Sequence, residues 1–331
     1  MNILFIGGTS FTGPFAIRHL VDAGHAVTVF HRGKSKASIL PEGVRHIIGD
    51  KDRLTEARAE FRAIRPDVVV NMMCLTTTDA EVFVDVFGDM AGRAVVISSA
   101  DVYRNYGRLH GTEPGPPDPL PLDEDAPLRE KLSEQGEHYN KTSVESIVRK
   151  APFPVTILRY SAIYGPEDPL NRTFDTVKRV DDGRRHILVQ DGVDTWRFHD
   201  CYCENAGHAL ALATVRPEAA GRVYNVADLK CPTVAERIHQ IARAAGWDGS
   251  IVTLKRDQLP EAMRFPGDLS ASLVLDTQRI RRELGYQEIV SYDEGLRRTI
   301  EWQRANPPEY TDAEFDYAAE DAALMKAGIA V

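Results

Sequence analysis

The sequence has few cysteines and no long hydrophobic run. Only four of its 331 residues are cysteine, at Cys74, Cys201, Cys203 and Cys231, and no two of them form a CxxC pair. Reduced and mostly buried thiols are therefore expected, rather than disulfides or a zinc site. No apolar run approaches the roughly 18 residues that a membrane-spanning helix requires, so no membrane association is expected.

Positive charge is also in deficit, with 40 Lys and Arg against 49 Asp and Glu, a net charge of −9. A protein that binds nucleic acid through electrostatics needs a basic face, so nucleic acid is not an expected partner. His199 and His208 have no ligand spacing that would indicate a metal site. Because Met1-Asn2 leads directly into a predicted strand, no signal peptide is expected and a cytoplasmic location is predicted.

The N-terminal segment has the pattern of a dinucleotide-binding turn. Four apolar residues, 3–6, are followed by the loop Gly7-Gly-Thr-Ser-Phe-Thr-Gly13 and by a helical pattern over 15–23. Glycines let a backbone approach phosphates closely, and a helix N-terminus offers free N–H groups to an anion. We therefore expect a pyrophosphate at this loop, contacted by Gly7, Thr9, Ser10, Phe11 and Gly13.

Strands and helices then alternate along the chain. The pattern predicts strands over 26–30, 44–48, 67–74, 94–99 and 155–159, with helices over 53–65, 79–90 and 135–150. Alternation of this kind indicates an α/β fold of the Rossmann type, a doubly wound parallel sheet with ligands at the carboxyl ends of its strands. Further candidates for cofactor contact near these ends are His31, Asp50, Met72, Met73, Ser98 and Tyr160.

The end of the second strand bears on cofactor choice. It reads His31-Arg-Gly-Lys34, with no Asp or Glu to hold the ribose hydroxyls of NAD. Arg32 and Lys34 suit a 2′-phosphate instead, so NADP is favoured over NAD.

The rhythm of strands and helices is lost over 167–192. Extended segments are expected at 197–203 and 222–226, and helices at 233–245, 277–284 and 311–326, the first with Thr233 as N-cap and Glu236 completing a capping box. We predict a dinucleotide-binding domain from 1–166 with 193–229, and a smaller substrate-binding domain from 167–192 with 230–331.

Several motifs together resemble the extended short-chain dehydrogenase/reductase family of the NAD-dependent epimerase/dehydratase type. They are the glycine loop, Gly49-Asp50, Ser98-Ser-Ala-Asp-Val-Tyr103, Lys141 with Glu145, Leu158-Arg-Tyr-Ser-Ala-Ile-Tyr-Gly-Pro166, Arg222-Val-Tyr-Asn-Val226 and Leu284-Gly-Tyr286. The resemblance implies a Rossmann domain with a smaller C-terminal substrate domain, small-molecule substrates that are commonly nucleotide-linked sugars, and a homodimer formed through helices 79–92 and 135–150. Ser10 replaces the family's middle glycine, and the loop is more similar to atypical members, of which some have lost catalysis and one chloroplast set binds RNA.

The resemblance also implies the reactive groups. In the family, a Ser or Thr hydroxyl polarises the substrate oxygen, and a Tyr moves the proton with help from a Lys four residues later, which also holds the nicotinamide ribose of the cofactor. Ser99 and Lys141 match two of these positions, but Glu137 stands where the Tyr belongs.

Three interpretations of this departure are open. Glu137 takes the proton role from the same helix face as Lys141. Alternatively, Tyr139 reaches the site from an irregular first turn, as Tyr103 or Tyr106 could also do. In the third, the protein binds a dinucleotide and does not catalyse the family reaction.

On the substrate side, Arg197 matches a family arginine that contacts a diphosphate, which suits a guanidinium. Ser161 or Ala162 replaces the family's substrate-side asparagine, and Tyr103 and Ser161 are further candidates for substrate contact. The sequence thus predicts an NAD(P)-dependent oxidoreductase or epimerase/dehydratase-like enzyme, with a non-catalytic dinucleotide-binding regulatory protein as the alternative.

Overall fold

A parallel sheet of seven strands forms the centre of the computed structural model, which describes residues 1–34, 40–132, 136–310 and 312–331. The strand order is β10-β6-β5-β4-β1-β2-β3, with every neighbouring pair parallel. The order reverses between β1 and β4, and ligands of such sheets bind at that point. The strands are β1 (Asn2–Ile6), β2 (Ala26–His31), β3 (Arg45–Ile48), β4 (Val68–Asn71), β5 (Arg93–Ser99), β6 (Val155–Tyr160) and β10 (Val223–Val226).

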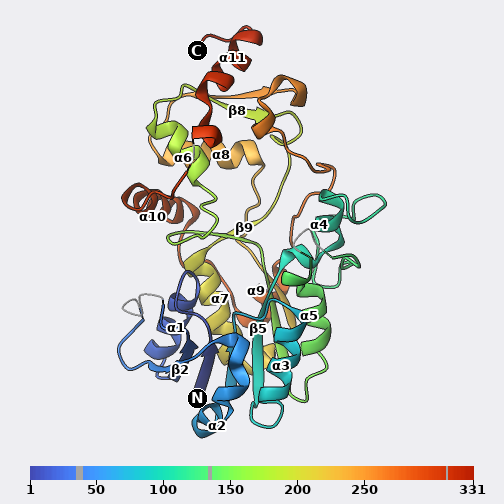
Figure 1. The fold of residues 1–331 in the computed structure, drawn as a ribbon, viewed down its shortest axis with the longest axis vertical. Helices are drawn as coiled ribbons and strands as arrows, with labels where there is room; N and C mark the ends of the chain where they lie inside the picture. The colour runs from blue at the N-terminus through green and yellow to red at the C-terminus, as the bar shows by residue number, and fades with distance from the viewer. Residues whose placement is uncertain (35–39, 133–135, 311) are drawn as a thin grey trace.

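Helices cover both faces of this sheet, so its central strands are apolar on both sides (Figure 1). One face packs against α1 (Gly13–Asp22) and α7 (Cys203–Val215), and also against α9 (Gln278–Leu284). The other face packs against α2 (Arg58–Ile64), α3 (Thr77–Phe87) and α5 (Lys141–Val148). The fold class predicted from the alternation is confirmed.

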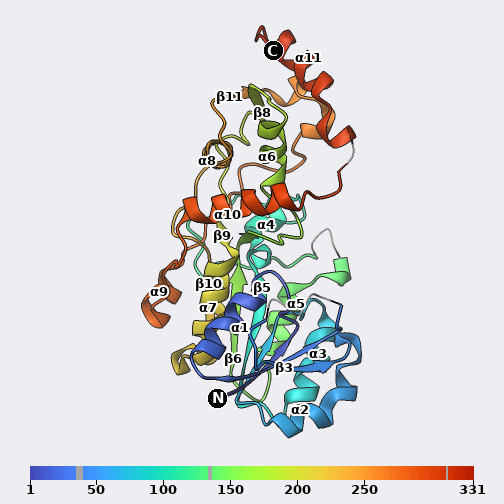
Figure 2. The ribbon, with the colours of Figure 1, turned by 90° about the vertical axis from the view of Figure 1, so that its left-hand side faces the viewer.

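A smaller unit lies beyond the carboxyl ends of the strands, at the top of Figures 1 and 2. Its parallel pair, β8 (His186–Gln190) and β11 (Ser250–Leu254), packs with α6 (Phe174–Asp181), α8 (Val234–Ala244) and α11 (Tyr317–Lys326). Between the units lie a second pair, β7 (Ala162–Tyr164) with β9 (Asp200–Tyr202), and α10 (Tyr292–Ala305). The Tyr224 hydroxyl on β10 donates to Glu283 on α9, so this C-terminal helix lies on the Rossmann side.

Several elements differ from their predicted bounds. The segment over 53–65 is a 3₁₀ stretch, η2 (Lys51–Ala57), that continues into α2. The helix expected over 135–150 begins only at Lys141, and residue 135 lies outside the described part. The helix expected over 311–326 is a 3₁₀ turn, η8 (Asp312–Phe315), followed by α11, while residue 311 is not described. The capping box of Thr233 and Glu236 on α8 is confirmed.

Short helices complete the chain: α4 (Arg104–Leu109) and the 3₁₀ turns η3 (Ala100–Val102), η4 (Gly136–His138), η5 (Pro217–Ala219), η6 (Arg256–Gln258) and η7 (Glu261–Met263). None of the helices in the described ranges combines the length and apolar character needed to cross a membrane.

Candidate active site

The glycine loop between β1 and α1 requires its glycines. Gly7 has φ +81°, and a Cβ there would lie 2.6 Å from Met73 Cγ. At Gly13 an added Cβ would lie 2.3 Å from the carbonyl oxygen of Gly8, which is backbone and cannot move aside. A bare backbone therefore lines the cradle that precedes α1, as a pyrophosphate site needs.

A hollow of about 220 Å³ opens beside this loop. It joins the carboxyl ends of β1, β2 and β3, and most of the predicted cofactor residues of those strands meet there. Its lining includes Gly7, Thr9, Ser10, His31, Arg32, Lys34, Asp50 and Met73.

The cationic end of this hollow is formed by the turn after β2. Arg32 and Lys34 are exposed, whereas His31 is buried and its Nε2 lies 2.9 Å from Nδ1 of His46. Burial and the neighbouring His46 lower the pKa of His31, so its ring is neutral at pH 7. Among the described residues of this turn, Arg32 and Lys34 are the cations that an anion can meet.

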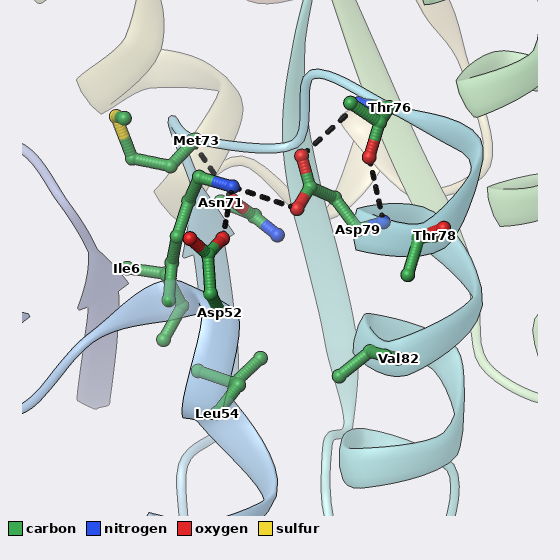
Figure 3. Close-up of a pocket in the computed structure, with 10 residues that line it drawn as sticks. Ile6, Asp52, Leu54, Asn71, Met73, Thr76, Thr78, Asp79 and Val82 are labelled. Carbon is green, nitrogen blue, oxygen red and sulfur yellow. Dashed lines mark hydrogen bonds and ion pairs between the residues drawn. The ribbon is translucent and has the colours of Figure 1, made fainter. Parts of the chain in front are cut away.

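A second hollow of about 270 Å³ adjoins the first on the side of α3. Ile6, Lys51, Asp52 and Met73 line both. The Lys51 ammonium bridges two carboxylates, at 2.7 Å from Asp52 and 2.8 Å from Asp79. Figure 3 shows these two acids at the lining of the hollow. Together the two hollows provide a continuous groove across the switch point of the sheet, with an apolar wall of Ile6, Leu54 and Val82.

The residues present thus fit a pyridine dinucleotide. The loop amides would face the pyrophosphate, the Arg32 end the adenosine ribose, and the apolar wall a flat base. Phe11 and Met72 flank the loop, and an added Cβ on Gly8 would lie 3.2 Å from Met72 Sδ. The Phe11 amide donates to the Glu167 carboxylate at 3.3 Å, so an acid already contacts this donor.

Tyr139 lies outside the helix that was expected to carry it. Asn140 is the N-cap of α5 and accepts from Ser143 N–H, so Tyr139 precedes the first turn. Freed from helical spacing, its side chain reaches the carboxyl end of β5, where it lies beside Ser99 and Asp101. The structure therefore brings together a hydroxyl and a phenol at the position that the family chemistry needs.

Lys141 lies beneath these groups. Its Nζ donates to the carbonyl oxygens of Cys74 at 2.7 Å and Ile97 at 2.9 Å, and it lies 5.5 Å from the centre of the Tyr139 ring. Burial lowers the pKa of this ammonium group. The Lys is close to the phenol ring, but its ammonium donates to two backbone carbonyls.

Glu137 does not have the placement that its proposed role requires. It is exposed in the turn η4, before the start of α5, and shares no helix face with Lys141. The expectation of a common helix is wrong because the chain is irregular up to Asn140.

Ser98 and Tyr103 point into the interior rather than the groove. Ser98 Oγ donates to Glu145 at 2.7 Å, and Glu145 accepts from Arg159 at 2.8 and 2.9 Å. The Tyr103 hydroxyl donates to Asn225 at 2.6 Å and accepts from Arg159 at 3.1 Å, and its side chain has no exposed surface. Their predicted contacts with cofactor and substrate are therefore replaced by a buried polar network that fixes the ends of β5 and β6.

Of the remaining candidate residues, two have buried hydroxyl groups and one is exposed. Tyr160 is buried, and its hydroxyl donates to the Ala206 carbonyl, so its side chain does not reach a cofactor. Ser161 Oγ is buried without a hydrogen-bond partner among the described residues. Arg197 is exposed at the junction of the two units. Its backbone forms an isolated antiparallel β-bridge with the backbone of Thr233.

Asp101 and Glu167 are site residues that the sequence did not single out. Asp101 could have been found from the sequence, because it follows Ser99 by two residues. A residue in that position must lie near the carboxyl end of β5, where ligands of such sheets bind. Glu167 lies far from the loop in sequence and only the fold places it there. Within the described ranges, no group of three or more His, Cys, Asp or Glu residues could hold a metal ion.

Comparisons with known proteins agree with this geometry. The model of the NAD dependent epimerase/dehydratase family matches residues 3–227. The chain is 29% identical to 2′-dehydrokanamycin reductase of Streptomyces kanamyceticus, covering 72% of this chain and 66% of the relative. It is 26% identical to the chloroplast stem-loop binding protein of 41 kDa b of Arabidopsis thaliana, covering 74% and 64%. The chain thus spans just under two thirds of the length of these two relatives.

Among solved structures, the chain is similar to the Bordetella bronchiseptica enzyme WbmG in complex with NAD and UDP. The TM-score is 0.69 at 18% sequence identity, with 92% of this chain and 95% of the other covered. At this identity the likeness shows a common fold.

Proposed function

The chain belongs to the NAD dependent epimerase/dehydratase family, and on that basis we propose that it is an NAD(P)-dependent oxidoreductase or epimerase/dehydratase-like enzyme. Its substrate carries a hydroxyl or carbonyl group, and a nucleotide-linked sugar is the first class to test, because the structural neighbour WbmG binds UDP. The observation that carries the proposal is the position of Tyr139 beside Ser99 at the carboxyl end of β5, with the buried Lys141 ammonium 5.5 Å from the centre of the Tyr139 ring.

Each of the two groups has a distinct role. The nicotinamide ring, when bound, supplies or accepts the hydride. The Ser99 hydroxyl donates to the substrate oxygen and polarises the C–O bond. The Tyr139 phenol gives its proton to that oxygen in reduction and removes it in oxidation. Because the two side chains lie beside each other, we propose that both reach one oxygen atom of the substrate.

Replacing Tyr139 tests the proposal directly. We expect Tyr139→Phe to lower turnover about 10²- to 10⁴-fold, which is what general acid–base groups contribute, while cofactor affinity stays within twofold. The measurement is cofactor absorbance at 340 nm with UDP-glucose, UDP-galactose and dTDP-glucose. Tyr106→Phe is the matched control, since it removes a neighbouring phenol. Equal activity of the Tyr139 variant and wild type would assign the proton role elsewhere.

We also propose that the cofactor is NADP rather than NAD. Arg32 and Lys34 line the groove next to β2, and no acidic residue follows that strand. A hydrogen-bonded charged contact contributes roughly 1.5–3 kcal/mol. Arg32→Ala is therefore expected to weaken NADP⁺ binding at least tenfold and to leave NAD⁺ binding unchanged, measured by calorimetry. An equal loss for both dinucleotides would contradict the preference.

A non-catalytic dinucleotide-binding protein is the second candidate. The observation that favours it is the Lys141 ammonium, which donates to two backbone carbonyls. Both candidates bind the cofactor, but only an enzyme exchanges hydride with a substrate, so the absorbance assay separates them.

The assembly that we propose is a homodimer in the cytoplasm. Helices α3 and α5 lie side by side on one face of the sheet, and Val84 and Ile147 on them are only partly buried. Sedimentation of the wild type and of Ile147→Glu tests the interface, since a charge there should yield monomers. Small molecules are the proposed partners; nucleic acid is not, despite the plant relative, because the net charge is −9.

A further inference from the structure

Two histidine rings lie in contact at the cationic end of the cofactor groove. His31 is the last residue of β2 and lines the hollow beside the glycine loop, together with Arg32 and Lys34. Its Nε2 lies 2.9 Å from Nδ1 of His46 on β3, and the two ring centres are 5.0 Å apart. The rings meet because His46 pairs with Val29, and side chains two residues apart on β2 point to the same face of the sheet.

The other nitrogen of the His31 ring holds the turn that follows β2. The Gly33 amide donates to His31 Nδ1 at 3.2 Å, a hydrogen bond between a side chain and the backbone two residues later. Gly33 has φ +72°, a left-handed conformation that favours glycine. The turn carries Arg32 on one side of Gly33 and Lys34 on the other, and both of these residues are exposed.

These two contacts determine where the ring protons lie. A nitrogen that accepts from an amide carries no proton, so the proton of the neutral His31 ring is on Nε2. Nε2 therefore donates to His46 Nδ1, and the proton of a neutral His46 ring is on its own Nε2. A further proton on either ring would break one of the two hydrogen bonds, because an N–H group would then face another donor.

Burial keeps the His31 ring in this position. The residue is 8% exposed, and its carbonyl oxygen accepts from the Gly49 amide at 3.0 Å, so the backbone is held as well. A buried ring with both nitrogens bonded cannot rotate without losing a hydrogen bond, and such a loss costs more in the interior than at the surface. The ring also has no nitrogen left for an incoming anion.

We propose that His31 is a specificity-determining positioning residue, whose Nδ1 holds the turn in which Arg32 and Lys34 meet a phosphate on the adenosine ribose. His31 acts through the Gly33 amide and not by contact with the cofactor, since both of its ring nitrogens are already bonded. His46 keeps the ring in the tautomer that can accept from that amide. The proposal rests on the preference for NADP proposed above.

The ring protons give a first test that needs no ligand. Two-dimensional ¹⁵N–¹H spectra of histidine side chains distinguish the two neutral tautomers, and the signals of His31 are those missing in His31→Asn. At pH 7.5 we expect the proton of His31 on Nε2. A proton on Nδ1 would overturn the proposal, because Nδ1 could not then accept from the Gly33 amide.

Two substitutions separate the hydrogen bond from the bulk of the ring. His31→Phe keeps a ring without an acceptor, whereas the carboxamide oxygen of His31→Asn takes the place of Nδ1 and can still accept from Gly33. His31→Phe should weaken NADP⁺ binding roughly three- to tenfold, the scale of one hydrogen bond, and leave NAD⁺ binding within about twofold. His31→Asn should restore most of the loss. Calorimetry measures the dissociation constants, and equal losses in both variants, or for both dinucleotides, would overturn the proposal.

His46 offers variants that leave the buried ring in place. Because His46 is exposed, its replacement is compatible with folding. His46→Phe removes the acceptor of the Nε2 proton, so the His31 ring can change its tautomer and the preference for NADP⁺ should fall at least about twofold. His46→Asn keeps an acceptor oxygen where Nδ1 lies and should preserve the preference. An unchanged preference in His46→Phe, or an equal fall in both variants, would overturn the proposal.

The wild-type protein keeps the two proposals distinguishable. If it binds NADP⁺ no more tightly than NAD⁺, the proposed cofactor preference fails and the role of His31 fails with it. If it prefers NADP⁺ and His31→Phe keeps that preference, the role of His31 alone is overturned.

Discussion

At the scale of single residues, Glu167 stands out because it contacts the phosphate cradle. Its carboxylate accepts from the Phe11 amide, and Phe11 has φ +55°, a left-handed conformation that is costly for a non-glycine residue. A bound pyrophosphate would need the same amide donor and would meet the negative charge of Glu167. The acid therefore opposes cofactor binding.

We predict that Glu167→Gln tightens NADP⁺ binding by about three- to tenfold, or roughly 1 kcal/mol, the scale of one exposed charge contact. Calorimetry at low salt measures the dissociation constant, and the gain should diminish in 0.5 M NaCl. Glu60→Gln, an exposed acid on α2, is the control and should change nothing. Weaker binding by Glu167→Gln would mean that the acid organises the loop instead.

His199 makes the protein sensitive to acid. Its ring is buried at 5% exposure, and its Nδ1 accepts from the Leu275 amide at 2.8 Å. Burial and the nearby Arg281 lower the pKa of His199 to about 4 from the ordinary value of 6.5. The unfolded chain therefore binds this proton more readily, so stability is present at pH 7 and is lost as pH falls from 6.5 toward 4.

Protonation of His199 is expected to lower the free energy of unfolding by about 3 kcal/mol at most. Urea unfolding between pH 7 and pH 4.5 should show a smaller decline for His199→Asn, whose oxygen can still accept from Leu275. His138→Asn, at an exposed position, should follow wild type. Parallel curves for all three proteins would exclude His199 as the source of acid lability.

At the scale of secondary structure, three strands of the sheet could be predicted almost to the residue, whereas the strand expected over 67–74 covers only Val68–Asn71. The interpretation placed strands at 26–30, 94–99 and 155–159, and the structure has Ala26–His31, Arg93–Ser99 and Val155–Tyr160. Each is a short apolar run bounded by polar or turn residues, because strands covered on both faces leave no other pattern. The pair β8 and β11 was not predicted, since its strands flank long irregular segments and pair residues that are 64 positions apart, such as Val189 and Thr253.

The site was predicted in part for the same reason. Gly7, Gly13 and Ser99 are fixed by the local order of strand and turn. Tyr139 required knowledge of where α5 begins, and helix starts are poorly defined by sequence. Asp101 became significant only when Arg129 and Tyr139, distant in sequence, were found beside it.

The start of α5 therefore controls the site, and Asn140 controls that start. Its side-chain oxygen accepts from the Ser143 amide and the Thr142 hydroxyl. We predict that Asn140→Ala lowers stability by about 1 kcal/mol, as cap removal usually does, and lowers turnover more than Thr142→Ala, because Tyr139 loses its anchor. Thermal melts and the absorbance assay measure both. Loss of stability without loss of turnover would separate the cap from the catalytic geometry.

At the scale of the whole molecule, the C-terminal segment completes the smaller unit. Phe174, Tyr310 and Phe315 form an aromatic cluster with ring centres 5.5–6.1 Å apart. The same three side chains also line a hollow of about 740 Å³. The division of the chain at 166/167, 192/193 and 229/230 stays a prediction, and α9 on the Rossmann side shows that the C-terminal half contributes to both units.

Helix α11 is held to this unit by a buried ion pair. Glu320, on α11, accepts from Arg179 Nη2 at 2.7 Å and Nε at 3.2 Å, and both side chains are about 3% exposed. Leu324 on the same helix packs against Leu188, Leu254 and Leu259. Within the described ranges, removing Glu320 leaves the buried Arg179 paired only with the exposed Asp175. The cost is therefore expected to stay below the roughly 3–5 kcal/mol of a buried charge that has no partner left.

Glu320→Ala is therefore expected to release α11 and to make the C-terminal segment sensitive to limited proteolysis. The Rossmann unit does not contain this contact, so NADP⁺ binding should persist while activity on a sugar nucleotide falls. Asp175→Asn is the matched control: Asp175 pairs with the same Arg179, but its side chain is 73% exposed and solvent can replace it. If both variants resist proteolysis equally, apolar packing by Leu324 is enough to hold the helix. The ion pair would then set the position of α11 along the unit and would not stabilise its attachment.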